Sequence, residues 1–393
     1  GTEYEVCRLA KKLNVPVLLW GPRDECPDEN GMRLRDSQCG LFATGKVLRR
    51  FGIPFTYLKN CNLEDECFAE GIDRFLRVCN VVKAFRNTRV LQISTRPFDF
   101  WSTMCNEGEL LEKFGIQLSP IPMPELTQAM KDVKENSPEE IKEVTDYCRE
   151  KMCIKVTPEQ LDNVAALKIA MTRLGKKYGC NCGAIQCWNA LQDEIGIMPC
   201  AANALCNDEG FPIACETDIH GTITSVLVEA AAMGETRSFF ADWTVRHPYN
   251  DNAELLQHCG PWPISIAKEK PTIDTPVAFD CSGSLMAQAK DGEHISLVRF
   301  DGDNGEYSLL LGNAKTVDGP YTKGTYMWVE VENLDRLEDK LVQGPYIHHC
   351  VGVHQDVVPV LYEACKYIGV TPDLYDPIEE KVKAIIRGEK VEK

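Results

Sequence analysis

Apolar runs and amphipathic segments alternate along the first two thirds of the chain. Val15 to Trp20 is a continuous apolar run that ends at Gly21-Pro22, which predicts a fully buried strand. The same pattern predicts helices over residues 3–13, 41–51 and 64–81, and further strands over 89–94, 182–188 and 211–221. Strands that alternate with helices at this spacing indicate parallel sheets covered by helices. We expect this α/β region to extend to about Asp242.

Two helices have clear start signals. Ser137-Pro138-Glu139-Glu140 and Thr157-Pro158-Glu159-Gln160 each place a hydroxyl residue at the N-cap, Pro at N1 and Glu or Gln at N3. Apolar positions at helical spacing follow the second signal as far as Gly179, which predicts a helix that ends there.

The pattern of apolar runs changes after Asp242. Short β-rich runs separated by turn signals cover residues 263–332, and Asp301 to Glu306 between two of these runs predicts a hairpin. A strand at 350–353, a helix at 357–368 and a last helix capped at Asp376-Pro377 are expected near the end. The fold class predicted is therefore α/β, with parallel-sheet α/β domains followed by an antiparallel β-rich C-terminal domain. We expect domains over residues 1–86, 87–240 and 241–393, the first starting at a helix without a preceding strand.

Composition excludes several classes of function. The 393 residues include 43 Lys and Arg against 59 Asp and Glu, so the net charge of −16 disfavours nucleic acid and anionic membranes as partners. No apolar run approaches the ~18 residues that a membrane span requires. The 19 cysteines are an odd number in a chain too large to need a disulfide framework, which favours reduced thiols and a cytoplasmic location.

The histidines indicate where chemistry could lie. Six of the seven fall in two windows, which contain His220, His247 and His258, and His348, His349 and His354. If "CETDIHG" is a strand, period-two alternation places Glu216, Asp218 and His220 on one face. Ionisable groups in apolar sequence need a charge partner, and a divalent cation would supply it. A solvated strand tip, with the acids hydrated or capping the next helix, is the alternative.

A further carboxylate, Asp242, ends the apolar run "SFFADW". Ligands bind beyond the carboxyl ends of parallel strands, so this position favours a role in the site. Two acids and one imidazole form a mostly oxygen ligand set, which suits Mn²⁺ or Mg²⁺ with positions left open for substrate. A metal that chelates neighbouring oxygens polarises the adjacent C–H, and a nearby carboxylate can move that proton as a general base.

The order of several motifs resembles the L-fucose isomerase family and its fucose/arabinose isomerase-like relatives. These motifs are "AIQCW", "CNDEGFPIACETDIHG", "FFADW", "HCGPWP" and "GPYIHHCVGV", and in the N-terminal half "PVLLWGP", "CGLFATGKVLRRFGIPF" and "STRPFDFWS". The resemblance spans nearly the whole chain, and the order of the motifs is more specific than any one of them.

The resemblance implies a metal-dependent aldose–ketose isomerase that converts an L-fucose-like or D-arabinose-like sugar through a cis-enediol. In that family a Glu, an Asp and a His hold a divalent metal, usually manganese, and they match Glu216, Asp242 and His349. The two acids also move the protons, and which acid serves C1 and C2 is left open.

The resemblance also implies the substrate contacts and the assembly. Gln186 matches a family residue that contacts substrate, His258 lies in a motif near the site, and His348 occupies a substrate-contacting position that is usually Asn. The family forms hexamers or trimers, so we expect a homo-oligomer. Its first strand, which brings an Arg to the site of a neighbouring subunit, has no counterpart in this chain.

Three alternatives stay open. The first is an isomerase of an anionic or sulfonated sugar, with Arg96, Arg246 or Arg299 binding the anion. The second is a catalytically inert sugar-binding relative, which would bind sugar without exchanging the C2 proton. The third is a metal-dependent aldolase, which would release a three-carbon product.

Overall fold

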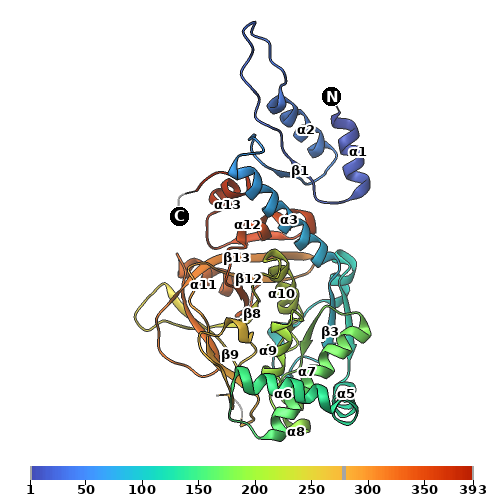
Figure 1. Cartoon of the computed structure of the whole chain (residues 1–393), viewed down its shortest axis with the longest axis vertical. Coiled ribbons are helices and arrows are strands. Elements are labelled where there is room, and N and C mark those ends of the chain that lie inside the picture. Colours follow the sequence, from blue (N-terminus) through green and yellow to red (C-terminus); the bar gives the residue numbers. More distant parts are fainter. Residues whose placement is uncertain (1, 277–279, 392–393) are drawn as a thin grey trace.

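The computed structural model describes residues 2–276 and 280–391, and its strands form sheets of two, four and ten strands. Figure 1 shows a narrow N-terminal lobe above a larger body, in which a helix-covered sheet lies beside a β-rich half. The predicted fold class is confirmed. The predicted division at residues 86 and 240 stays a prediction.

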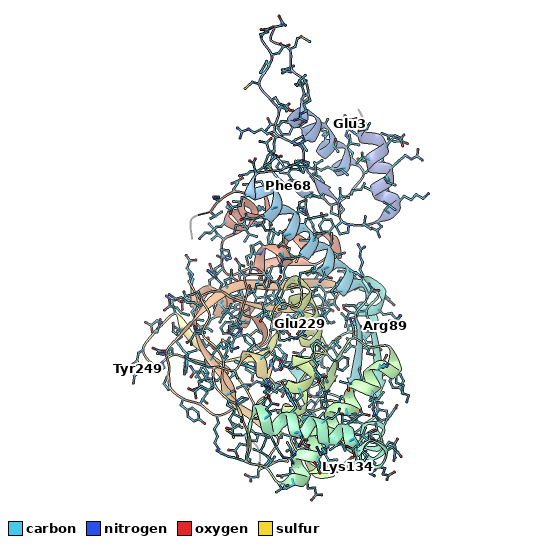
Figure 2. The ribbon with its side chains drawn as sticks, in the orientation of Figure 1. Glu3, Phe68, Arg89, Lys134, Glu229 and Tyr249 are labelled. Carbon is cyan, nitrogen blue, oxygen red and sulfur yellow. The ribbon has the colours of Figure 1, made fainter. Side chains whose placement is uncertain are left out.

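The N-terminal lobe contains α1 (Glu3–Leu13), α2 (Ser37–Arg50) and the parallel pair β1 (Leu18–Leu19) and β2 (Thr56–Tyr57). The strand predicted at residues 15–20 is shorter than expected and only half-buried, because it has one partner strand. The lobe meets the long helix α3 (Glu66–Arg86) through the rings of Trp20 and Phe68, which lie 4.6 Å apart. Figure 2 labels Phe68 at the base of the lobe.

A four-stranded parallel sheet forms the middle of the chain. Its order is β4 (Gln117–Ile121), β3 (Arg89–Ile93), β6 (Cys182–Ile185) and β7 (Ile213–Ala214). Alternate side chains enter separate cores. One core contains α5 (Met123–Asn136), α6 (Pro138–Lys151), α7 (Pro158–Tyr178) and α9 (Cys200–Asp208), and the other contains α3 and α10 (Ile219–Ala231). The carboxyl ends of β3, β6 and β7 therefore lie together at one edge.

The β-rich half is a mixed ten-stranded sheet that partly closes on itself. Antiparallel pairings run from β13 (Glu306–Val317) through β12 (Ile295–Asp303), β15 (His349–Val353), β8 (Phe239–Arg246), β9 (Ala253–His258) and β14 (Thr325–Glu330) back to β13. Because these pairings form a closed ring of strands, this half of the body resembles a barrel. The hairpin predicted at residues 301–306 is confirmed, because Asp303 pairs with Glu306.

The remaining strands extend this sheet at both ends. On one side are β11 (Ser284–Gln288), β10 (Thr272–Asp274) and β5 (Cys153–Ile154), and on the other is β16 (Thr371–Leu374). The remaining α-helices in the described part of the chain are α4 (Glu107–Glu109), α8 (Ala190–Ile195), α11 (Leu334–Gln343), α12 (Val358–Ile368) and α13 (Glu379–Ile386). No helix in the described part of the chain combines the length and apolar character that a bilayer span needs.

Two predictions for the chain beyond residue 237 were wrong. The strand "SFFADW" does not close the parallel region, because β8 pairs antiparallel with β15 and β9 and continues past Asp242 to Arg246. The last helix begins at Glu379 with Ile378 as its N-cap, so Asp376 lies outside it.

The two capping signals differ in the structure, and this difference gives a test. Thr157 accepts the Gln160 N–H at 3.2 Å, and the Gln160 side chain accepts the Thr157 N–H at 3.0 Å. Ser137 occupies the N-cap of α6 without accepting an N–H of that helix. We expect Thr157→Ala to lower the free energy of unfolding by about 1 kcal/mol in urea denaturation. Ser137→Ala is the control and should change it less; equal losses would contradict the cap assignment.

Candidate active site

Glu216 lies in a tight turn between β7 and α10. The strand predicted to reach His220 ends at Ala214, and both Glu216 and Thr217 adopt left-handed backbone angles, with φ of 53° and 52°. Asp218 is the N-cap of α10, where it accepts the Gly221 N–H at 2.9 Å, and His220 is in the helix. The predicted common strand face is therefore wrong. A β-branched residue at positive φ is strained, and such strain is found where surrounding contacts fix a functional group.

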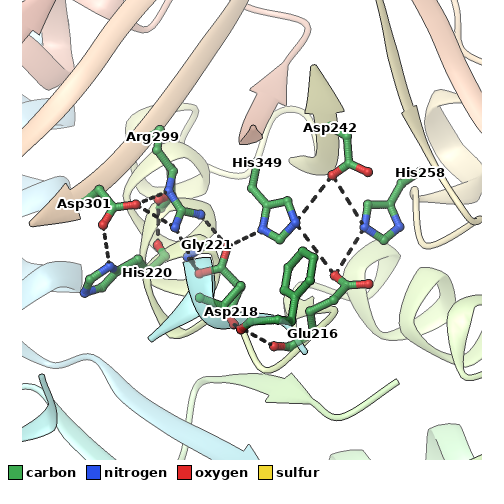
Figure 3. Close-up of polar contacts among 12 residues, drawn as sticks. Glu216, Asp218, His220, Gly221, Asp242, His258, Arg299, Asp301 and His349 are labelled. Carbon is green, nitrogen blue, oxygen red and sulfur yellow. Dashed lines mark hydrogen bonds and ion pairs between the residues drawn. The ribbon is translucent and has the colours of Figure 1, made fainter. Parts of the chain in front are cut away.

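Four ionisable side chains nevertheless converge on one point (Figure 3). His349 Nε2 lies 3.5 Å from Asp242 Oδ1 and 4.0 Å from Glu216 Oε2. His258 Nε2 lies 3.9 Å and 3.4 Å from the same two oxygens. The structure thus brings together the three residues predicted as metal ligands, and adds His258 to them.

Three strands and a turn position this cluster. Asp242 on β8 is directly opposite His349 on β15, so their side chains share one face of the sheet. On the other side of β8, Asp242 pairs with Gln257, and His258 follows as the last residue of β9. Glu216 reaches the same point from the carboxyl end of the parallel sheet, so the site lies where the two sheets meet.

The carboxylates in this cluster are short of hydrogen-bond donors. Among the described residues, Glu216 Oε2 and Asp242 Oδ1 are buried atoms without a hydrogen-bond partner. Glu216, His258 and His349 are buried, whereas the Asp242 side chain keeps 26% of its surface exposed. Two unsatisfied carboxylate oxygens between two imidazoles fit a divalent cation, and Asp242 marks the side from which solvent reaches it.

The electrostatics of the cluster lead to the same conclusion. Burial alone would raise the pKa of Glu216, but the imidazoles of His258 and His349 lower it to about 2. Burial would lower the pKa of His258, but the carboxylates of Asp242 and Glu216 raise it to about 9. The acids thus favour a positive charge at this point of the site, and a divalent cation would also supply one.

A buried network holds His349 in place. His349 donates Nδ1–H to Asp218 Oδ2 at 2.7 Å, which leaves its Nε2 directed at the cluster. Arg299 binds both oxygens of Asp218 and also binds Asp301, and Asp301 Oδ1 lies 2.9 Å from His220 Nδ1. Asp218 and His220, predicted from the strand pattern as possible site residues, thus belong to this supporting network. Sequence reasoning missed the pairing of Asp218 with His349, because the two are 131 positions apart.

The loop after β3 covers the cluster. Ser94 donates to Gln186 Oε1 at 2.8 Å, and Thr103 donates to the backbone carbonyl of Glu216 at 3.4 Å. Phe100 stacks on His349 with ring centroids 5.5 Å apart and meets His348 edge-on at 5.7 Å. The predicted substrate contacts Gln186 and His348 therefore lie beside the cluster. Phe100 was not singled out from the sequence, although its segment is one of the family-like motifs.

Comparison with known proteins identifies the relatives of this chain. Residues 1–86 match the family model described as "Fucose/sulfoquinovose isomerase, N-terminal domain". The chain is 25% identical over 375 residues to the sulfoquinovose isomerase of Priestia aryabhattai, covering 94% of this chain and 82% of the relative. The predicted resemblance to the fucose isomerase family is confirmed.

A second relative gives the same result. The sulfoquinovose isomerase of Alkalicoccus urumqiensis is 24% identical over 357 residues, which cover 90% of this chain and 79% of that protein. The predicted enzyme class, an aldose–ketose isomerase, is thereby confirmed as well.

The network behind His349 gives a second test. Asp218 and Arg299 are both 1% exposed, so Asp218→Asn would leave the guanidinium with Asp301 as its one remaining carboxylate partner in the described structure. Because the substitution removes a charge-assisted pair from the core while Asp301 still compensates the guanidinium, we expect the free energy of unfolding to fall by about 1.5–3 kcal/mol in chemical denaturation. Asp303→Asn is the control, because Asp303 is exposed on the hairpin that also carries Arg299 and Asp301. It should change the free energy of unfolding little. Similar losses in both variants would contradict the structural role of Asp218.

Proposed function

We propose that this protein is a divalent-metal-dependent isomerase that interconverts a sulfonated aldose and the corresponding ketose. The convergence of Glu216, Asp242 and His349, with two carboxylate oxygens that lack donors, supports the metal site. The names of the relatives favour a sulfonated sugar over fucose or arabinose. We expect Mn²⁺ in preference to Mg²⁺, because imidazole ligands suit transition metals better.

Each side chain has a part in this proposal. Bound at Glu216, Asp242 and His349, the cation would polarise the vicinal oxygens of the open-chain sugar and stabilise negative charge there. One carboxylate moves the proton between C1 and C2, and the other assists the transfer between the hydroxyls. The Glu216 carboxylate is held in place for proton transfer, because its Oε1 accepts hydrogen bonds from the Cys187 thiol and the Trp188 indole, both at 3.3 Å.

Aromatic side chains exclude water from this point. The ring of Phe100 lies against His349 on one side and meets Trp188 at 6.1 Å on another. A wall of this kind shields an enediol from bulk solvent, so the proton taken from C2 stays available for C1. Partly exposed Asp242 and exposed His348 leave the opposite side open for the sugar to enter.

Of the three arginines considered for the anionic group, the surroundings favour Arg96. Arg299 is committed to Asp218 and Asp301, and Arg246 binds Asp335 and Glu338 on the surface.

Arg96 lies in the loop that covers the site, stacked 4.4 Å above the ring of Trp101. It donates to the backbone carbonyls of Pro97 and Phe98 and has no carboxylate partner among the described residues. The adjacent Thr95 carbonyl accepts from Thr217 Oγ1 at 3.0 Å, which ties the loop to the turn that holds Glu216. An arginine with unused donors beside the site can bind a sulfonate as it would a phosphate.

Substitution of the acids tests the proposed catalysis. We expect Glu216→Gln and Asp242→Asn to lower kcat by about 10²- to 10⁴-fold with the circular dichroism spectrum unchanged, because each removes a positioned proton carrier. The exposed Glu209→Gln is the matched control. The assay follows ketose formation and deuterium exchange at C2 from sulfoquinovose with Mn²⁺, before and after EDTA. Retained turnover in Glu216→Gln would refute the proposal, exchange-free binding would favour an inert relative, and a three-carbon product would indicate an aldolase.

Substitution of Arg96 tests the class of sugar. A charge-assisted hydrogen bond contributes about 1.5–3 kcal/mol, so Arg96→Gln should lower kcat/KM for the sulfonated aldose by roughly 10- to 100-fold. Turnover of a neutral aldose should not fall. Arg246→Gln, which changes an arginine already paired with two acids, is the control and should leave both values unchanged. Equal losses of kcat/KM on both sugars would show that Arg96 supports the loop and does not bind the sulfonate.

A further inference from the structure

We infer that Cys61, Asp65 and Cys67 form a separate metal site, which binds Zn²⁺ where the N-terminal lobe joins the body. One ligand atom of each residue, two sulfurs and a carboxylate oxygen, lies within 4.8 Å of the other two. The cluster is built from the loop after β2 and the first turn of α3, whereas the proposed active site lies where the two larger sheets meet. None of the three residues was singled out from the sequence.

The separations suit a common zinc ion. Around a tetrahedral ion, ligand atoms that lie about 2.0 to 2.3 Å from the metal are roughly 3.3 to 3.8 Å from one another. The three atoms here already lie within 4.8 Å of one another, so small rotations of the side chains reach these separations. All three come from one short segment, with three residues between Cys61 and Asp65 and one between Asp65 and Cys67. Such short spacings are typical of structural zinc sites.

Cys61 lies where a buried thiolate ligand would need to lie. Its side chain is 3% exposed, and the indole N–H of Trp20 donates to its sulfur at 3.4 Å. A metal-bound thiolate accepts contacts of this kind, which orient the sulfur and stabilise its negative charge. The sulfur of Cys61 is therefore already supplied with a supporting donor.

Asp65 supplies the carboxylate. It is the N-cap residue of α3, yet its side chain accepts no N–H of that helix. An N-cap Asp normally makes such a bond. Here Oδ2 accepts the N–H of Asn62 at 2.8 Å, and the N–H of Asp65 donates to the Asn62 carbonyl at 3.2 Å. The carboxylate is thus directed toward the loop, beside the two thiols, where it can supply a third ligand atom.

The donor set favours zinc over a disulfide and over harder ions. Cys67 is half-buried in the first turn of α3, where the end of the helix dipole favours negative charge. A disulfide between Cys61 and Cys67 is the other use of two neighbouring thiols, but it would not explain the position of the Asp65 carboxylate. A metal ion accounts for all three donors. Thiolate ligands suit Zn²⁺, whereas Mn²⁺ and Mg²⁺ prefer oxygen.

An ion at this point would join the N-terminal lobe to the body. The Asn60 side chain donates to the carbonyls of Gly21 at 3.0 Å and Pro22 at 2.7 Å. The segment that carries Cys61 is therefore tied to the loop after β1. Cys67 belongs to α3, whose later turns pack in a core of the body. Figure 1 shows the lobe directly above α3. The ion would thus link two parts that otherwise meet through side-chain packing.

The experiment uses the full chain with its thiols reduced and titrates it with Co²⁺ or Zn²⁺. Thiolate ligands give Co²⁺ a sulfur-to-metal charge-transfer band in the near ultraviolet, and isothermal titration calorimetry measures the Zn²⁺ affinity. We expect this band in the unaltered protein and in Glu216→Gln, and its loss in the double variant Cys61→Ser/Cys67→Ser. Asp65→Asn should weaken Zn²⁺ binding at least about tenfold. Cys26→Ser, which changes an exposed thiol of the same lobe, is the control and should match the unaltered protein.

Each other result would overturn the inference and leave the proposed function standing. These results are no band in the unaltered protein, a band that persists without Cys61 and Cys67, and a band that is lost in Glu216→Gln, which would place the thiolate ligand at the proposed active site. If the double variant does not fold, X-ray absorption at the zinc edge decides on Glu216→Gln loaded with one equivalent of Zn²⁺. Two sulfur ligands are expected there, and a spectrum without sulfur would refute the site.

Discussion

The structure is organised around the cost of burying two carboxylates that face each other. Glu216 and Asp242 direct oxygens without hydrogen-bond donors at a common point, where apolar cores pack on several sides. Isolated buried anions are expensive, so a positive charge near these oxygens stabilises the site. The two acids accordingly raise the pKa of His258 to about 9, and the same arrangement fits a divalent cation. The acids, the imidazoles and the cation are thus one electrostatic unit.

The fold provides this unit by joining two kinds of sheet. The parallel sheet delivers Glu216 beyond the end of β7, through two successive residues with left-handed backbone angles. The barrel-like half delivers Asp242, His258 and His349 from adjacent antiparallel strands. Behind them, Arg299 pairs with both Asp218 and Asp301 and helps to lower the pKa of Asp218, so the carboxylate that orients His349 can stay ionised in the core. Neither half of the body contains a complete ligand set by itself.

The sequence predicted the parts of this arrangement that depend on local patterns or on resemblance. Thr157 and Gln160 form the expected capping box, whereas Ser137, in the same pattern, does not cap α6, and its hydroxyl accepts a hydrogen bond from Arg173 at 2.9 Å. Resemblance placed Glu216, Asp242 and His349 in one site. Alternation failed for Asp218 and His220, because it assumes an extended backbone and the chain turns at Glu216. Contacts such as Asp218 with His349, and the pairing of β8 with β15, join distant segments and leave no local pattern.

The charge of the site also bears on where an anionic sugar can be recognised. The described network around the cluster contains four carboxylates, those of Glu216, Asp218, Asp242 and Asp301, against the single guanidinium of Arg299. A divalent cation would be largely neutralised by these acids, so it would offer little attraction to a sulfonate. The chain as a whole carries a net charge of −16, which would repel one. The proposed sulfonate therefore needs a separate cation, and Arg96 on the covering loop is the candidate because it has no carboxylate partner among the described residues.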